Sequence, residues 1–394
     1  MNVAQVTHLY RPSYGGIENY VFRLNESLRA DGHGTRTLTT DHSLSESAPY
    51  SPPDGVRYYG TNFSLFRNPF SWGLYKGVRE TPADLYHLHS PFSLVSLEAA
   101  AAMRDETPVV VTMHGVRPYG ETQLTGHLER FYRPFANYVF DRCSAVIVLG
   151  ERERERLLER YDVDPAVVRT IPNGIDLAEY DVSGGDRERF REKYDLRPDV
   201  PTVSFVSRLV PKKRPEALID AFVEHLPEAR ADVLVVGGGD EDYIDSLRDR
   251  SDERFTFLRG LPFEELCAVY ALSDVFTMLS EAEGLPTVVL EAMYLETAVI
   301  GTEAGAMPEV LEGGGVVLDD VTPSRVAETL ERYLENPEVR AEHAAHNREV
   351  VERRYSWERV YEEIRGVYGS IADANPTEDG STRSAYGAGV ERSP

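Results

Sequence analysis

Short apolar runs alternate along the chain with longer segments in which apolar residues recur every three or four positions. The runs predict buried strands, and the recurrence, as in Ile17, Val21, Leu24 and Leu28, predicts helices with one apolar face. The strand candidates of the first half are residues 3–10, 35–40, 84–88, 109–113, 145–149 and 168–171. Those of the second half are residues 202–206, 232–236, 255–258, 274–279, 298–301 and 316–318. Such alternation predicts an α/β protein with parallel sheets in two doubly wound series.

The two series are separated by the segment IPNGID at residues 171–176, where Pro and Asn-Gly interrupt regular structure. We therefore expect one domain over residues 1–172 and a second over 173–355. A final helix is predicted at 356–372. Residues 373–394 are rich in Gly, Ser and Thr without apolar periodicity, which predicts a disordered tail. Two facing α/β domains would form a cleft with helix N-termini pointing into it.

The net charge of the chain limits the classes of binding partner. The 394 residues carry 42 Lys and Arg against 66 Asp and Glu, a net charge of −24, which argues against nucleic-acid binding. The lysines are only four, namely Lys76, Lys193, Lys212 and Lys213. Self-repulsion between so many carboxylates is tolerable where salt screens it, so we expect a halophilic protein from a salt-adapted cytosol.

The cysteine content and the length of the apolar runs indicate the cellular compartment. Cys143 and Cys267 are the only cysteines, and they lack metal-type spacing, so we expect buried free thiols in a reducing compartment. No stretch reaches the ~18 apolar residues of a membrane span. We expect a cytoplasmic protein and leave open peripheral contact at the cytoplasmic membrane face.

The most informative segment is SEAEGLPTVVLEAM at residues 280–293, between a strand and a helix. Pro286 is predicted as the first helical residue, where a missing N–H costs nothing. The N–H groups of Thr287 and Val288 would then face an anion at the helix N-terminus.

Two carboxylates flank this helix start. Glu283 lies in the loop, and Glu291 lies just over one turn inside the helix. Carboxylates accept hydrogen bonds from vicinal hydroxyls, so the pair suits a ligand with two hydroxyl-bearing parts separated by phosphates. The alternative is ordinary placement of acidic residues near a positive helix end.

A second segment, residues 204–216, reads SFVSRLVPKKRPE and joins a strand to a helix that Pro215 could open. Arg208 and Lys213 would present two cations to the cleft. Half of the lysines lie in this short run, which favours a diphosphate site within an acidic protein. The alternative is a solvated surface run.

Glycines follow two other strands. Gly15 and Gly16 form a strand-to-helix turn where a phosphate could approach the backbone, although a tight turn without a ligand explains them equally well. Gly237–Asp240 resembles a dinucleotide fingerprint, but the third glycine is absent and the acidic residues that follow would repel a pyrophosphate. We interpret Asp240 as a helix N-cap and expect no metal.

Histidines also gather at strand ends. His114 follows a strand, at the sheet edge where ligands bind in α/β proteins. His8, His87 and His89 could suggest metal ligands, but no carboxylate or cysteine stands at suitable spacing. Core histidines are the commoner outcome, and we single out only His114.

These motifs, taken in order, resemble one family. EGLPTVVLEAM, in which seven residues separate Glu283 from Glu291, is similar to the E-x7-E motif of retaining GT-B glycosyltransferases of family four. The resemblance extends through GGIE, HLH, TMHG, IPNGID, SRLVPKKRP, FLRGLPFEEL and AGAMPEVL. YGGIENYV and HSPFS further resemble the phosphatidylinositol N-acetylglucosaminyltransferase branch.

The resemblance implies two Rossmann-like domains facing a cleft, with the final helix packing back on the first domain, here an acceptor domain. The second domain would hold a nucleotide-sugar donor such as a UDP- or GDP-sugar. Arg208 and Lys213 would neutralise its diphosphate. Glu291 would bind the ribose, and Glu283 would contact the donor sugar. No cofactor and no metal would be needed.

Further positions follow from the same resemblance. Gly16 would offer its N–H to the distal phosphate, and His114 would lie against the donor sugar near the reacting carbon. The backbone from Leu285 would lie beside that sugar. The family often has Gly-Phe-Gly where this chain has Gly-Leu-Pro, so phosphate contacts would come from Thr287 and Val288. Ser207 and Arg214 replace two usual glycines beside the cationic loop.

The implied activity is hexosyl transfer with retention to a glycan or lipid-linked acceptor, with a role in cell-surface glycan biosynthesis. The leaving diphosphate would be stabilised by cations and helix N-termini and would take the acceptor's proton. Aromatic residues in segments 58–76 and 119–140 could form an acceptor lid, a membrane patch or core packing. A nucleotide-sugar isomerase and a non-catalytic nucleotide-sugar sensor are the alternatives.

Overall fold

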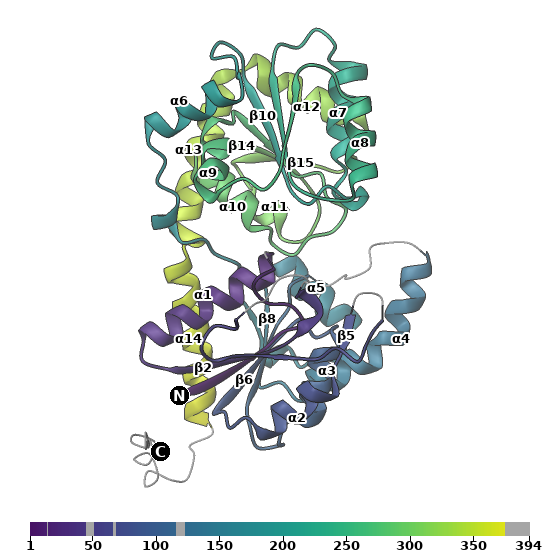
Figure 1. The fold of residues 1–394 in the computed structure, drawn as a ribbon, viewed down its shortest axis with the longest axis vertical. Coiled ribbons are helices and arrows are strands. Elements are labelled where there is room, and N and C mark those ends of the chain that lie inside the picture. Colours follow the sequence, from purple (N-terminus) through teal and green to yellow (C-terminus); the bar gives the residue numbers. More distant parts are fainter. Residues whose placement is uncertain (14, 45–50, 66–67, 116–122, 375–394) are drawn as a thin grey trace, which may run out of the picture.

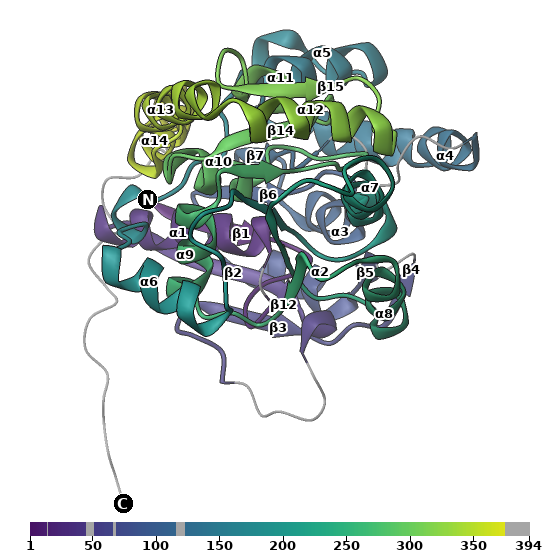
Figure 2. The ribbon, with the colours of Figure 1, turned by 90° about the horizontal axis from the view of Figure 1, so that it is seen from above.

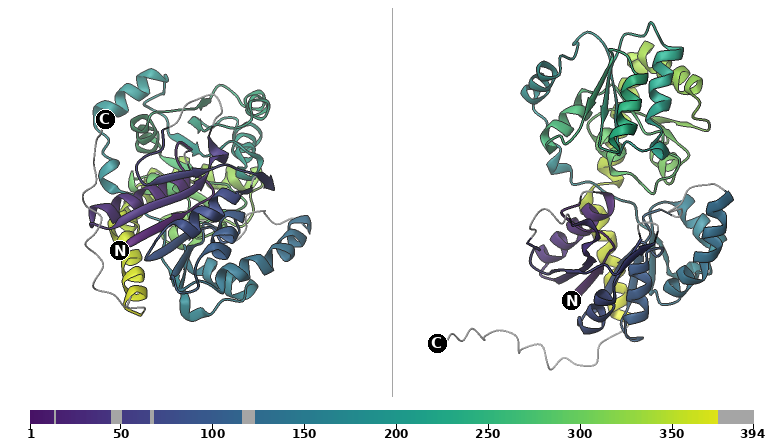
Figure 3. Two further views of the ribbon diagram at one scale, coloured as in Figure 1. Left: turned by 60° about the horizontal axis from the view of Figure 1, so that its bottom comes forward. Right: turned by 45° about the vertical axis from the view of Figure 1, so that its right-hand side comes forward.

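The chain is described here from a computed structural model that covers residues 1–13, 15–44, 51–65, 68–115 and 123–374. Figure 1 shows two α/β units, one above the other, each built around its own sheet. Figure 3 shows the same arrangement from two further directions. The predicted fold class, two Rossmann-like α/β domains, is confirmed. The predicted tail from residue 375 onward lies outside the described residues.

The first sheet has seven strands in the order β3-β2-β1-β6-β7-β8-β9, and every pairing is parallel. Its strands are β1 Asn2–Val6, β2 Gly34–Thr40, β3 Val56–Tyr59, β6 Leu85–His89, β7 Val109–Thr112, β8 Ala145–Val148 and β9 Val168–Thr170. The helices of this domain are α1 Gly16–Ala30, α2 Trp72–Glu80, α3 Leu94–Ala102, α4 Gln123–Phe140 and α5 Glu151–Arg160.

The second sheet has six parallel strands in the order β12-β11-β10-β13-β14-β15. They are β10 Thr202–Val206, β11 Asp232–Val236, β12 Phe255–Leu258, β13 Val275–Thr277, β14 Ala298–Thr302 and β15 Gly315–Leu318. The helices here are α6 Gly184–Lys193, α7 Pro215–Asp220, α8 Glu241–Arg250, α9 Phe263–Leu272, α10 Thr287–Tyr294, α11 Met307–Val310, α12 Pro323–Glu335 and α13 Pro337–Arg354.

Every predicted strand is present, and the central strands of both sheets are fully buried, as expected for parallel sheets covered by helices. The first one is shorter than predicted. β1 ends at Val6, and the following turn is closed by a hydrogen bond from the Thr7 hydroxyl to the Leu9 carbonyl. The pattern also missed β3 and the hairpin of β4 Phe63–Leu65 and β5 Asn68–Phe70. All three residues of β4 are exposed, so no apolar run marks this strand.

The last helix, α14 Trp357–Ala374, packs against the first domain (Figure 2). Trp357, Ile364 and other apolar residues of one face share a buried cluster with Val3 and Leu24. The Trp357 indole donates to the Ser27 hydroxyl at 2.8 Å. The chain therefore crosses between the domains a second time at this helix.

The two crossings lie side by side. The Ile175 N–H donates to the Tyr355 carbonyl at 3.0 Å, and the Trp357 N–H donates back to the Ile175 carbonyl at 2.7 Å. This bridge ties the IPNGID segment to the start of α14. Motion of one domain relative to the other must therefore pass through a paired hinge.

Candidate active site

Loops from both sheets meet at the carboxyl ends of their strands. The turn after β7 carries His114 and Gly115, and the loop after β13 carries Glu283 and Gly284. A β-carbon placed on Gly284 would lie 3.2 Å from both the Gly115 nitrogen and the His114 carbonyl carbon. The two loops are thus in backbone contact across the domain boundary, which only a glycine permits.

Helix α10 begins one residue later than predicted. Pro286 is its N-cap, with extended ψ of 124°, so Thr287 is the first helical residue. The Val289 N–H donates to the Pro286 carbonyl at 3.1 Å, whereas no such bond from Thr287 or Val288 is found among the described residues. These two N–H groups remain available to an anion, as the sequence predicted.

The loop before this helix is anchored from the interdomain segment. Leu285 is buried, and its carbonyl accepts a hydrogen bond from the Asn173 amide at 2.7 Å. The Asn173 side chain belongs to the IPNGID motif, 112 residues away in sequence. Sequence reasoning placed Leu285 beside the donor sugar but assigned Asn173 no role, although its motif was recognised.

Lys213 and Glu283 form an ion pair between two loops of the second domain. Lys213 ends the short turn Pro211–Lys213 after β10, and Pro215 opens α7 as predicted. The two side chains are only 11% and 13% exposed. The cation expected at the diphosphate and the carboxylate expected at the sugar therefore lie next to each other.

Arg208 is exposed at the end of β10 and faces the N-terminus of α1, which begins at Gly16. Glu18 belongs to the first turn of α1, and its carboxylate folds back so closely that a β-carbon on Gly15 would lie 2.5 Å from it. Burial raises the pKa of Glu18, and its own backbone N–H and the Arg208 charge oppose that rise. A carboxylate thus lies beside the glycine turn where the sequence predicts a phosphate, and sequence reasoning assigned Glu18 no role there.

Glu291 lies deepest in this part of the site, inside α10 and 8% exposed. Burial raises its pKa, and the hydroxyl groups of Tyr270, Thr287 and Tyr180 beside it partly offset the rise. The Tyr270 hydroxyl is buried and makes no well-formed hydrogen bond to another described group. A carboxylate in such a setting can accept from ligand hydroxyls without competition from water.

His114 ends a chain of buried histidines. Its Nε2 lies 3.2 Å from His89 Nδ1, and His89 Nε2 lies 2.8 Å from the Gln5 side-chain oxygen. The His114 ring also meets the edge of the Tyr20 ring, with centroids 5.1 Å apart. Burial lowers the pKa of His114 to about 3, so its imidazole is neutral at physiological pH.

His87 and His89 are core residues. Both are fully buried, and His87 is held by Tyr368 of α14 at 2.6 Å and by Thr112 at 2.7 Å. His87 thereby connects the sheet to the last helix. Of His87, His89 and His114, only His114 is partly exposed, at the edge where the two domains meet.

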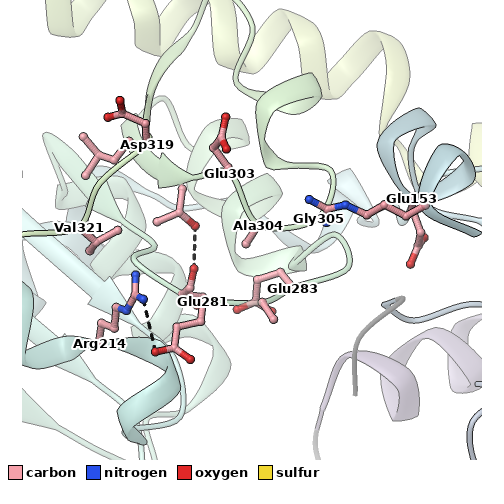
Figure 4. Close-up of a pocket in the computed structure, with 14 residues that line it drawn as sticks. Glu153, Arg214, Glu281, Glu283, Glu303, Ala304, Gly305, Asp319 and Val321 are labelled. Atoms are coloured by element: carbon pink, nitrogen blue, oxygen red, sulfur yellow. Dashed lines mark hydrogen bonds and ion pairs between the residues drawn. The ribbon is translucent and has the colours of Figure 1, made fainter. Parts of the chain in front are cut away.

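A pocket of about 420 Å³ adjoins this site (Figure 4). It is lined by five carboxylates and two guanidinium groups, which are Glu153, Glu281, Glu283, Glu303, Asp319, Arg156 and Arg214. Figure 4 shows Arg214 pointing toward Glu281, with which it forms an ion pair at 3.4 Å. The excess of carboxylates disfavours binding of a phosphorylated ligand in this pocket.

A further residue links the domains. Glu309 of α11 accepts hydrogen bonds from the N–H groups of Glu151 and Arg152 at 2.9 and 2.8 Å, at the start of α5. The N-cap of α5 is Gly150, which has no side chain to do this. Glu309 lies in AGAMPEVL, so the motif was visible in the sequence but the contact was not.

The two halves of the chain match two family profiles. Residues 14–179 match the family described as Glycosyltransferase Family 4, and residues 186–350 match the one described as Glycosyl transferases group 1. The sequence is 30% identical over 340 residues to D-inositol 3-phosphate glycosyltransferase of Corynebacterium glutamicum, covering 79% of this chain and 78% of that protein. It is 25% identical over 398 residues to a phosphatidylinositol N-acetylglucosaminyltransferase protein of Arabidopsis thaliana, covering 93% and 81%.

Solved structures share the fold. Sucrose-phosphate synthase from Thermosynechococcus elongatus superposes with a TM-score of 0.77 at 20% identity, covering 95% of this chain and 99% of that one. HepE of Anabaena in complex with UDP-glucose gives a TM-score of 0.74 at 20% identity, covering 94% and 100%.

Proposed function

This chain belongs to the family 4 glycosyltransferases with a GT-B fold, and we propose that it transfers a hexose-type sugar, with retention, from a nucleoside-diphosphate donor to a glycan or lipid-linked acceptor. One observation carries the proposal. The Lys213–Glu283 pair lies at the loops that lead to the free N–H groups of Thr287 and Val288. Cations, oriented amides and carboxylates at one sheet edge suit a ligand that is both phosphorylated and rich in hydroxyls.

The donor's charged part would be held by two kinds of group. Arg208 and Lys213 would neutralise the diphosphate, and the α10 N-terminus would donate from Thr287 and Val288. Gly16 at the α1 N-terminus would reach the distal phosphate from the first domain, once Glu18 moves aside. As the bond to the sugar breaks, negative charge grows on the phosphate, so these same groups stabilise the transition state.

The donor's hydroxyl-bearing parts would be held by the two carboxylates. Glu291 would accept from the ribose hydroxyls in its buried position beside Tyr270. Glu283 would accept from the sugar hydroxyls, and the Leu285 backbone, fixed by Asn173, would line the same place. His114 would lie against the sugar as a neutral hydrogen-bonding group, because its pKa is lowered to about 3.

The reaction itself needs no protein nucleophile in this proposal. The nucleotide leaves from one face of the sugar, and the acceptor hydroxyl attacks on that same face. The leaving phosphate oxygen takes the acceptor's proton as the new bond forms. Catalysis then rests on positioning and on charge stabilisation, which together account for large rate enhancements. The chain supplies all of these groups without a metal in this proposal.

The activities named for two relatives suggest the first acceptors to test. D-inositol 3-phosphate and phosphatidylinositol share an inositol ring that carries a phosphate. We therefore propose an acceptor hydroxyl on a phosphorylated ring or on a lipid headgroup, with the cytoplasmic membrane face as the place of reaction for a lipid. A salt-rich cytosol remains part of the proposal because of the net charge of −24.

The test is a donor and acceptor screen in molar KCl. UDP- and GDP-sugars are first ranked by thermal shift, and the best donor is incubated with inositol phosphate, phosphatidylinositol and polyprenyl-linked sugars. Formation of a new glycoside supports the proposal. Epimerised or hydrolysed donor without acceptor would favour the isomerase alternative, and donor binding without any turnover would favour the sensor.

A further inference from the structure

Helix α2 carries an exposed aromatic and cationic face. Trp72, Tyr75, Lys76 and Arg79 occupy positions i, i+3, i+4 and i+7, so they share one side of the helix. Trp72 is 61% exposed, and Lys76 and Arg79 are exposed as well, whereas Tyr75 is half-buried against the domain core. The opposite side, with Leu74 and Val78, is buried against the domain core.

The hairpin before α2 extends this face. Phe63 of β4 is 53% exposed and stacks on Phe70 of β5 with ring centroids 4.8 Å apart. Phe70 in turn meets the edge of Trp72 at 4.8 Å. Leu65 adds a further exposed apolar side chain at 41%. We call Phe63, Leu65, Phe70, Trp72 and Tyr75 the aromatic face.

This face is held in place by polar anchors beneath it. The Asn62 side chain accepts from the Trp72 N–H at 2.8 Å, and the Asn62 N–H donates to the Phe70 carbonyl at 2.9 Å. The Asn68 side chain accepts from the Leu94 N–H at 2.9 Å and so fastens the hairpin to the start of α3. The rings are therefore presented on a fixed support, which lowers the ordering cost of binding.

The charged residues around the aromatic face indicate which kind of partner it can bind. Residues 55–79 contain no Asp or Glu, in a chain whose 394 residues include 66 of them, and the first carboxylate after this run is the exposed Glu80 at the end of α2. A carboxylate here would be repelled by anionic headgroups and would cost desolvation at a bilayer. Lys76 is moreover one of the chain's few lysines. Aromatic rings flanked by cations are typical of segments that lie at a membrane interface.

We propose that the aromatic face, with Lys76 and Arg79 beside it, docks the first domain onto an anionic lipid bilayer. The rings enter the headgroup boundary while the two cations contact lipid phosphates. No helix among the described residues is long and apolar enough to cross a membrane, so such contact would be peripheral. In Figure 1, α2 lies at the end of the first domain that is away from the second domain, and it packs against a different apolar cluster from the one that contains α14.

The proposal does not depend on the proposed transfer reaction, because vesicle binding needs neither donor nor turnover. The second aromatic segment, residues 119–140, gives weaker support for membrane docking. Its side chains before residue 132 lie outside the part of the chain whose side chains are described, and the exposed rings that are described are Phe135 and Tyr138.

The test compares vesicles of phosphatidylcholine alone with vesicles of equal parts phosphatidylcholine and phosphatidylglycerol, by flotation of the full chain. Trp72 provides a direct signal, because the only other tryptophan, Trp357, is 7% exposed and packed between α14 and the first domain. We expect flotation with the anionic vesicles, a blue shift of the tryptophan emission, and its quenching by brominated lipid. These measurements need no variant. Absence of flotation, or an unchanged emission, would overturn the proposal.

Variants then locate the surface. Phe63→Ala with Trp72→Ala should weaken vesicle affinity about tenfold to a hundredfold through lost apolar burial. Lys76→Gln should weaken it about fivefold in dilute salt, and little in molar KCl, where charges are screened. Phe263→Ala, which removes an exposed ring from the second domain, is the matched control and should bind as the wild type. Equal flotation with both vesicle types, or unchanged binding of the aromatic double variant, would overturn the proposal.

Discussion

The ammonium group of Lys213 and the carboxylate of Glu283 form an ion pair that joins the loop after β10 to the loop after β13. Both side chains are almost nine-tenths buried, so each fixes the direction of the other in a setting of low dielectric. In the proposed reaction a donor phosphate competes for Lys213 while the donor sugar offers hydroxyls to Glu283. One ligand would thus satisfy both partners at once, which couples recognition of the diphosphate to recognition of the sugar.

Glu291 should make donor binding dependent on pH. Burial raises its pKa above that of an ordinary glutamate, and only the ionised form accepts from two ribose hydroxyls. Donor affinity should therefore weaken on acidification at a higher pH than an exposed carboxylate would cause. Glu291→Gln should bind the donor about tenfold more weakly at neutral pH and lose this pH dependence. Calorimetric titration at several pH values measures both effects, and a variant with the wild-type pH profile would contradict the assignment.

Acidification should destabilise the fold through its buried histidines. Burial lowers the pKa of His8 to about 4 and of His87 to about 3, against ~6.5 in an unfolded chain. The unfolded chain therefore binds more protons below pH ~6.5, so this stability is complete above that pH and is lost as the pH falls toward the folded values. Over this range each such histidine makes the free energy of unfolding fall by up to ~1.4 kcal/mol for each unit by which the pH is lowered.

His87→Gln should flatten that slope in urea unfolding between neutral pH and pH ~5. Glu98 acts in the opposite direction, because burial raises its pKa to about 8 and the folded state keeps its proton. The comparison is therefore made between variant and wild type at each pH. Equal slopes for the two proteins would show that His87 is not kept neutral by the fold.

Glu309 should contribute to closure of the two domains. Its carboxylate caps α5 of the first domain from α11 of the second, and N-cap losses cost about 1 kcal/mol. Glu309→Ala should lower the melting temperature slightly and increase the radius of gyration in small-angle scattering. Glu312→Ala, an exposed neighbour one turn away, serves as the control. Identical scattering of the two variants would argue against an interdomain role.

Salt should stabilise the protein. With a net charge of −24, repulsion between carboxylates falls as the Debye length shrinks to ~3 Å in molar salt. We expect the melting temperature to rise steadily from dilute buffer to molar KCl. A melting temperature that is equal in both would contradict salt adaptation.

The sequence predicted this fold because each apolar run coincides with a strand buried on both faces. Glu283, Glu291, Arg208 and Lys213 could be chosen as candidates because they lie in short motifs whose spacing is local, and their roles stay predictions. Pro286 was misplaced by one position, since its fixed φ suits both an N-cap and a first helical residue.

Other features were out of reach for local patterns. Glu309 contacts backbone 157 residues away, and nothing near it in sequence announces that contact. The hairpin of β4 and β5 produced no strand signal because all of β4 is exposed and β5 has only three residues. The exposed apolar side chains of β4 are also the reason why this hairpin is proposed as a membrane surface.

The most direct test follows sugar transfer by NMR, with the donor and acceptor found in the screen, for wild type, Lys213→Ala and Lys193→Ala. Lys193 also pairs with a glutamate, Glu265, but on the exposed surface of the second domain, so its loss is the matched control. We predict a product with the donor's anomeric configuration, a turnover at least about 10²–10³-fold lower in Lys213→Ala, and wild-type turnover in Lys193→Ala. An inverted product, or near-normal turnover in Lys213→Ala, would contradict the account.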